Sequence, residues 1–137
     1  MRLLEQNLVQ LRGFQNVKSD DKISGVQIPI RLKYYRGVWA SQLRSATVKI
    51  NGIEYKGNQI FWTINGVNIE QSDLPKEGNI HWNSLDVAML TIRKEGGLLP
   101  GSYNVKITYD LSSSYMPPEI DTGFFECSGE RKMILVK

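Results

Sequence analysis

The chain has 137 residues, enough for one compact domain with its own core, and we expect a single domain over residues 1–137. Hydrophobic residues make up 41% of the chain and charged residues 23%, a composition that excludes a disordered protein. The net charge is only +3 and the basic residues are scattered from Arg2 to Lys137, so we expect no nucleic-acid partner.

The sequence predicts a cytoplasmic protein without a membrane anchor. The first residues carry charges at Arg2 and Glu5 and lack the apolar run of a secretory signal. No window approaches the length of a membrane-spanning helix. Cys127 is the single cysteine, so the chain cannot form an internal disulfide, which fits a reducing compartment.

Short apolar or alternating runs separated by turn residues predict β-strands along the chain. Such runs span residues 26–32, 47–50, 60–64 and 133–136. Turn signals between the runs are too frequent to leave room for long helices. Pro29 removes one backbone donor from the first run, so we expect that strand to lie at a sheet edge or to bulge there.

Turn residues predict three hairpins. Asn51-Gly52 and Asn65-Gly66 each separate two strand-like runs, and this dipeptide favours the type I′ turn between antiparallel strands. Residues 90–92 and 105–109 alternate as half-buried strands do. Between these two runs, residues 95–101 hold three glycines and a proline, so we expect a tight connection and a third hairpin.

The predicted fold class is all-β, an antiparallel two-sheet β-sandwich of the jelly-roll type. About eight to ten short strands in one domain are typical of two sheets that share a single core. A closed barrel is the alternative. The only predicted helix is a single turn around residues 72–75, which Ser72 or Asp73 could cap.

The sequence offers little for catalysis. His81 is the only histidine and Cys127 the only cysteine, and neither has the spacing of a nucleophile or metal-ligand motif, so we predict no metal site and no catalytic residue. His81, beside Trp82, is interpreted as a surface or interface residue, and Cys127 as a small apolar side chain near a strand. Glu119 and Asp121 could share one face of a strand, as a glycosidase pair would, although acids near turns are normally solvated. An enzyme that works alone through these acids or through Cys127 is one alternative.

Two segments have the residue types of protein interfaces. Tyr34 and Tyr35 would face opposite sides of a strand, so one ring can enter the core while the other meets solvent or a partner. Arg36 beside them is a residue type common at binding hot spots, although both tyrosines could also line the core with Arg36 solvated. The prolines that follow Tyr115 and Met116 should direct that segment out of the sheet, as a stiff arm or as a plain rigid turn.

The sequence resembles the small β subunit of the C-glycoside deglycosidases. The resemblance rests on the order and spacing of Tyr34-Tyr35-Arg36-Gly37, the run 90–98, Pro100-Gly101 and Ser114-Tyr115-Met116-Pro117. It implies a β-sandwich subunit that assembles with a large TIM-barrel α subunit, which holds a divalent, manganese-like metal and the acid/base residues. The complex would cleave the carbon–carbon bond between a 3-oxo sugar and an aromatic aglycone such as a flavonoid. The resemblance assigns no catalytic residue to this chain.

Six residues that match the family's pattern are expected to pack against the α subunit, close to the substrate entrance. They are Tyr34, Tyr35, Arg36, Tyr115, Met116 and Pro117. A second alternative is a stand-alone carbohydrate-binding sandwich in which Trp39, Trp62 or Trp82 stacks on a sugar ring. Of these, Trp62 is expected in the core, whereas Trp39 and Trp82 lie near turns and could be exposed.

Overall fold

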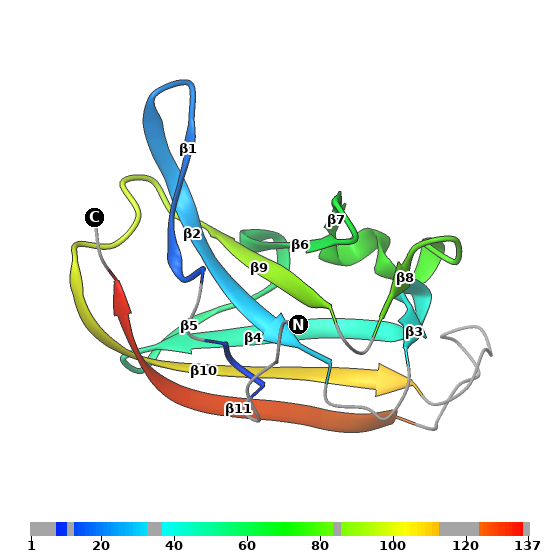
Figure 1. The fold of residues 1–137 in the computed structure, drawn as a ribbon. Helices are drawn as coiled ribbons and strands as arrows, with labels where there is room; N and C mark the ends of the chain where they lie inside the picture. Colours follow the sequence, from blue (N-terminus) through cyan, green and yellow to red (C-terminus); the bar gives the residue numbers. More distant parts are fainter. Residues whose placement is uncertain (1–7, 11–12, 33–36, 84–85, 113–123, 136–137) are drawn as a thin grey trace.

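Two antiparallel β-sheets lie face to face and form the body of the molecule (Figure 1). The computed structural model describes residues 8–10, 13–32, 37–83, 86–112 and 124–135. Within these ranges every strand pair is antiparallel and the helical elements are short 3-10 turns. The predicted all-β antiparallel sandwich is confirmed.

The first sheet has the strand order β1-β2-β9-β6-β7, and the second has the order β11-β10-β4-β5. The strands of the first sheet are β1 (Gln15–Ser19), β2 (Lys22–Arg31), β6 (Ile60–Ile64), β7 (Val67–Glu70) and β9 (Val87–Arg93). Those of the second are β4 (Leu43–Ile50), β5 (Ile53–Tyr55), β10 (Gly101–Ser112) and β11 (Phe124–Leu135). The other elements are the ribbon strands β3 (Val38–Trp39) and β8 (His81–Trp82), and the 3-10 turns η1 (Ala40–Gln42), η2 (Gly57–Gln59) and η3 (Gln71–Lys76).

Alternate side chains of both sheets point into the space between them and form the hydrophobic core. On β10, for example, Val105, Ile107 and Tyr109 are buried while their neighbours are more exposed. The ring of Tyr109 packs against Trp62 and Trp82 at centroid distances of 5.6 and 6.2 Å. These three rings join the first sheet, the second sheet and the β3–β8 ribbon at one point of the core.

Both Asn-Gly hairpins predicted from the sequence are confirmed. Asn51-Gly52 joins β4 to β5, and Asn65-Gly66 joins β6 to β7. All four residues have positive φ angles, between 51° and 86°. A type I′ turn requires positive φ at both central positions, and Asn and Gly tolerate it best.

The third predicted hairpin is wrong. Its two runs are strands, but β9 belongs to the first sheet and β10 to the second, so the intervening loop crosses between the sheets. Asn16 of β1 fastens this loop: its side chain donates to the carbonyl of Leu98 (2.9 Å) and accepts from the N–H of Leu98 (3.0 Å). A Cβ at Gly97 would lie 2.3 Å from Oδ1 of Asn16, so this contact requires glycine. An alternating pattern identifies a strand but not its neighbour.

The prediction that the strand with Pro29 is an edge strand or bulges is also wrong. β2 lies between β1 and β9, and its register with β9 is continuous from Gly25 to Arg31. The carbonyl of Pro29 accepts a hydrogen bond from the N–H of Gln10 (3.0 Å). In an antiparallel strand the nitrogen and the carbonyl of one residue point to the same side, so the nitrogen of Pro29 also points toward Gln10. The missing donor therefore faces residues 8–10, beyond the end of β1, and the ladder to β9 stays intact.

The helical turn predicted around residues 72–75 is present as η3, but the predicted cap is wrong. Glu70 is its N-cap residue, and no side chain caps it. Neither Ser72 nor Asp73 is the cap, because η3 begins at Gln71 and both residues lie inside it.

Gln71, the first residue of η3, connects the two sheets through its buried amide group. Its Oε1 accepts from the N–H of Ala46 on β4 (2.6 Å) and from Nε1 of Trp62 on β6 (3.0 Å). Its Nε2 donates to the carbonyls of Ala46 and Gly57, each at 3.2 Å. Gln71 is only 6% exposed, so water can hardly replace these bonds if the side chain is removed.

Replacing Gln71 by Leu is expected to lower the free energy of unfolding by about 3–5 kcal/mol. Each buried polar group left unsatisfied costs about 1–3 kcal/mol, and partial relaxation lowers the sum. Urea unfolding followed by tryptophan fluorescence measures the loss. The exposed Gln15→Leu on β1 is the matched control and should stay within about 0.5 kcal/mol of the parent. A loss below about 1 kcal/mol for Gln71→Leu would contradict the role of this amide.

An exposed ion pair lies on the outward face of the first sheet. Arg93 on β9 donates through both Nη atoms to the two carboxylate oxygens of Glu70, and its guanidinium lies 4.8 Å from the ring centroid of Phe61. The hydrogen bond from Arg93 is the main cause that lowers the pKa of Glu70 below 4.5. A carboxyl group with a lowered folded pKa stabilises the fold above its unfolded pKa, and this contribution disappears as the pH falls through the folded value.

Replacing Glu70 by Gln is therefore expected to cost at most about 1 kcal/mol at pH 7, since exposed ion pairs are screened by water and salt. The difference from the parent should shrink and then vanish as the pH falls below 4.5 and through the lowered pKa of Glu70. Urea unfolding at several pH values tests this, with the exposed Glu95→Gln as a control that shows no such trend. A difference that stays constant with pH would argue against the ion pair as its source.

Candidate partner-binding site

The six residues predicted to contact a partner lie outside the described ranges. They are Tyr34, Tyr35, Arg36, Tyr115, Met116 and Pro117, and the same holds for Glu119 and Asp121. The described residues on either side of them show where these segments join the sandwich.

One end of the molecule holds three of the residues that border the segments 33–36 and 113–123, namely Gly37, Ser112 and Phe124 (Figure 1). Gly37 follows residues 33–36 and leads directly into β3. Ser112 and Phe124, on either side of residues 113–123, form the last pair of the β10–β11 ladder. In Figure 1, β3 and this end of β10 and β11 lie on the same side of the sandwich. The two segments therefore join the fold at a common end.

The β3–β8 ribbon at this end places its side chains on two faces. Val38 pairs with Trp82, and Trp39 pairs with His81. Val38 and Trp82 are buried, whereas Trp39 and His81 are only partly buried. Because successive residues of a strand point to opposite faces, the outer face of the ribbon presents Trp39 and His81 together.

Trp39 and His81 form an aromatic pair with fixed geometry. Their ring centroids are 4.9 Å apart and the rings are inclined at 71°, an edge-to-face arrangement. The backbone N–H of Trp39 donates to Oε1 of Gln42 (2.9 Å), and the N–H of Ala40 donates to the carbonyl of Ile80 (2.7 Å). The backbone around the pair is thus held on both sides. A partly exposed, rigid aromatic surface of this kind is well suited to contact a partner.

Gly37 lies in direct contact with His81. A Cβ at this position would lie 2.4 Å from Cε1 and 2.7 Å from Nε2 of His81, and 2.9 Å from the carbonyl oxygen of Trp82. Glycine is therefore required here by space. The chain that leaves residues 33–36 must pass against the histidine ring before it enters β3.

The three tryptophans have different surroundings. Trp62 is in the core, as predicted, but the expectation that Trp82 could be exposed is wrong, because it is 1% exposed and its Nε1 donates to the carbonyl of Asp86 (3.0 Å). Of the three, Trp39 alone retains partial exposure and could stack on a sugar ring. Cys127 is buried on β11, in agreement with its interpretation as a small apolar side chain.

A metal centre has no basis in the described part of the chain. No group of three or more His, Cys, Asp and Glu side chains comes together there.

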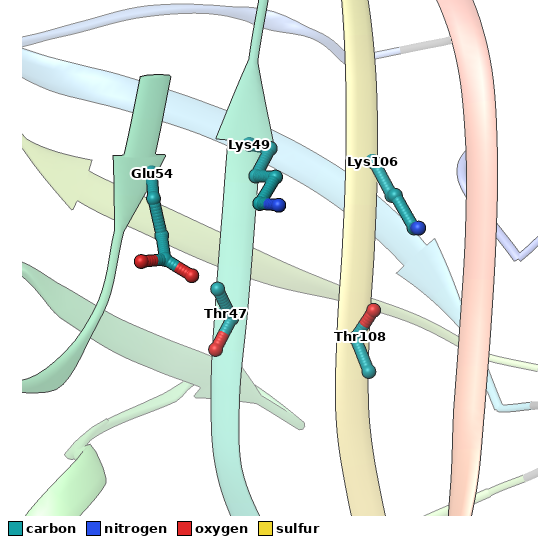
Figure 2. Close-up of a pocket in the computed structure, with 5 residues that line it drawn as sticks. All are labelled: Thr47, Lys49, Glu54, Lys106 and Thr108. Carbon is teal, nitrogen blue, oxygen red and sulfur yellow. The ribbon is translucent and has the colours of Figure 1, made fainter. Parts of the chain in front are cut away.

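A second surface, which the sequence analysis did not identify, lies on the outward face of the second sheet. Figure 2 shows a polar groove there, lined by Thr47 and Lys49 of β4, Glu54 of β5, and Lys106 and Thr108 of β10. Its volume is about 220 Å³. The alternation of residues 47–50 and 105–109 indicated which side chains face outward. Only the register of β4 against β10 brings the side chains of the two strands together.

Comparison with known proteins assigns the chain to a family. Residues 4–115 match the family described as C-glycoside deglycosidase beta subunit. The C-glycoside deglycosidase beta subunit of Eubacterium cellulosolvens (strain ATCC 43171 / JCM 9499 / 6) is 36% identical over 121 residues, which cover 88% of this chain and 82% of that protein. The chain belongs to the C-glycoside deglycosidase beta subunit family. None of the helices in the described ranges is long and apolar enough to cross a membrane.

Replacing Gly37 by Ala is expected to displace the ring of His81 and to lower the free energy of unfolding by about 1–3 kcal/mol, because the added methyl group has no space. His81 is the only histidine, so its imidazole signals in a proton NMR spectrum report the displacement without ambiguity. Gly78→Ala is the matched control, since a Cβ there would meet no atom closer than 4.0 Å. Unchanged imidazole signals in Gly37→Ala would contradict the close contact.

Proposed function

We propose that this chain is the accessory β subunit of a heteromeric C-glycoside deglycosidase, a lyase that cleaves the carbon–carbon bond between a 3-oxo sugar and an aromatic aglycone such as a flavonoid. The observation that carries the proposal is the family match over residues 4–115, together with the 36% identical relative. In this proposal the complex works in the cytoplasm.

In this proposal the catalytic role and the supporting role lie on different subunits. A ketone at C3 of the sugar acidifies the proton at C2, and its removal by a base allows the aglycone to leave C1 by elimination. We place the base, the acid and the divalent, manganese-like metal on a TIM-barrel α subunit. The β subunit contributes a rigid surface that binds this partner.

The proposed contact surface is the end of the sandwich where both predicted segments join the fold. Tyr34, Tyr35 and Arg36 would approach the α subunit beside the Trp39–His81 pair, and residues 115–117 would approach it from the end of the β10–β11 ladder. A stable heterodimer buries on the order of 1,600 Å² in total, with aromatic and arginine anchors near the centre. Trp39 is a partly exposed aromatic residue at this end, and the proposal adds Tyr34, Tyr35 and Arg36 beside it, close to the substrate entrance.

Co-expression with the α subunit tests the proposal. We expect the two chains to elute together from a sizing column and to release aglycone from a 3-oxo-C-glycoside in the presence of manganese, whereas neither chain alone is active. The double variant Tyr35→Ala/Arg36→Ala should weaken assembly by about 100-fold or more, as loss of central anchors does. The matched control is Leu99→Ala, in the loop before β10, where an 80% exposed side chain should be dispensable.

One result would contradict the proposed contact surface, and another would contradict the proposed function. The first is assembly and turnover that the double variant leaves unchanged, which would remove residues 35 and 36 from the interface. The second is a lack of co-elution, combined with a saturable change in intrinsic tryptophan fluorescence when glycosides are added to this chain alone. That outcome would favour the stand-alone carbohydrate-binding module.

A further inference from the structure

Two lysines lie directly opposite each other on the outward face of the second sheet. Lys49 on β4 pairs with Lys106 on β10, and two positions along the same ladder Thr47 pairs with Thr108. Residues two apart in a strand share a face, so all four side chains lie on the solvent side of the sheet. Directly opposite residues have Cβ atoms only about 4.5–5.5 Å apart, and like charges in such a pair are destabilising.

Each of the two lysines has an acidic residue opposite it on its other side, but neither acid forms an ion pair with it. Glu54 is the cross-strand neighbour of Lys49, but its Oε2 lies 3.9 Å from Nζ of Lys56. Glu130 is the neighbour of Lys106 on the other side, and its Oε2 accepts from Nδ2 of Asn104 (2.8 Å). Among the described residues, no ion pair joins Lys49 or Lys106 to a carboxylate. Two positive charges are thus held together by the register of the sheet.

The groove around the lysine pair has the shape and the donors for a small ligand. In Figure 2 the ammonium group of Lys49 lies between β4 and β10, that of Lys106 points to the far side of β10, and the two threonines lie beside them along the strands. A volume of about 220 Å³ is below the usual size of a drug-like pocket and suits one small polar group. Ammonium groups and hydroxyls are donors that suit phosphate oxygens.

We propose that this groove binds a phosphate-type oxyanion, carried either by free phosphate or by a sugar phosphate ester. Lys49 and Lys106 supply the positive charge, and the hydroxyls of Thr47 and Thr108 donate hydrogen bonds to the remaining oxygens. The anion removes the repulsion between the two lysines, so the binding free energy includes relief of a cost that the unliganded sheet carries. The carboxylate of Glu54, on the β5 side, opposes the bound anion, and it can accept a hydrogen bond from a sugar hydroxyl of an ester. This site is independent of the proposed partner-binding end.

The test is titration of the full chain at low ionic strength, where charge pairs are least screened, by isothermal calorimetry with inorganic phosphate, glucose 6-phosphate and glucose. Equal concentrations of chloride control for general salt effects. We expect saturable binding of at least one phosphate compound and none of glucose. Tighter binding of glucose 6-phosphate than of phosphate identifies the ester as the source, and the reverse order identifies free phosphate.

Variants locate the site. Lys49→Gln and Lys106→Gln should each weaken phosphate binding by about 5-fold or more, since each removes one of the two charges at the groove. Lys22→Gln removes one exposed charge from the other sheet and should leave binding unchanged. Circular dichroism checks that each variant folds. The proposal is overturned if no phosphate compound binds saturably, or if Lys22→Gln weakens binding as much as the two groove variants.

Discussion

The amide group of Gln71 is the polar connection on which the packing of the sandwich depends. One side chain satisfies the backbone of β4 at Ala46, the indole of Trp62 on β6 and the carbonyl of Gly57 in η2. Hydrophobic burial brings two sheets together without fixing their relative position, because it is non-directional. Hydrogen bonds depend on distance and angle, so a buried, fully used amide sets how the first sheet lies on the second.

The packing around Gln71 continues through the core to the candidate partner-binding end. Trp62 packs edge-on against Trp82 at 6.2 Å, and Trp82 belongs to the ribbon whose other face presents Trp39 and His81. The aromatic pair at the surface is therefore attached to the core through its own strands. A surface prepared in this way loses little conformational entropy when a partner binds, which favours affinity. This is the property that a supporting subunit needs if it is to hold the loops of a catalytic partner.

The outward faces of the two sheets differ in whether the charged side chains form ion pairs. On the first sheet Arg93 and Glu70 satisfy each other, and the ring of Phe61 covers the guanidinium. On the second sheet the register places Lys49 opposite Lys106 without a carboxylate between them. A like-charge pair on adjacent strands costs stability, and Glu54 and Glu130, which lie opposite the two lysines on their other sides, offset part of this cost. An anion between the lysines removes their repulsion, and this is why the groove, rather than the first sheet, carries the inference of a binding site.

The sequence by itself determined strands within β2, β4, β6, β9 and β10, the two Asn-Gly hairpins and the family. Turn chemistry at Asn51-Gly52 and Asn65-Gly66 is local, and period-two alternation reports burial directly. The sequence did not determine which strands lie next to each other in a sheet. The strands on either side of the loop 94–100 enter different sheets, and Pro29 lies within an interior strand, since its missing donor faces residues 8–10. The groove at Lys49 and Lys106 and the contact of Gly37 with His81 likewise join residues far apart in the chain. Only the tertiary structure decided these, because the register between strands is set by packing of the whole core and not by any local pattern.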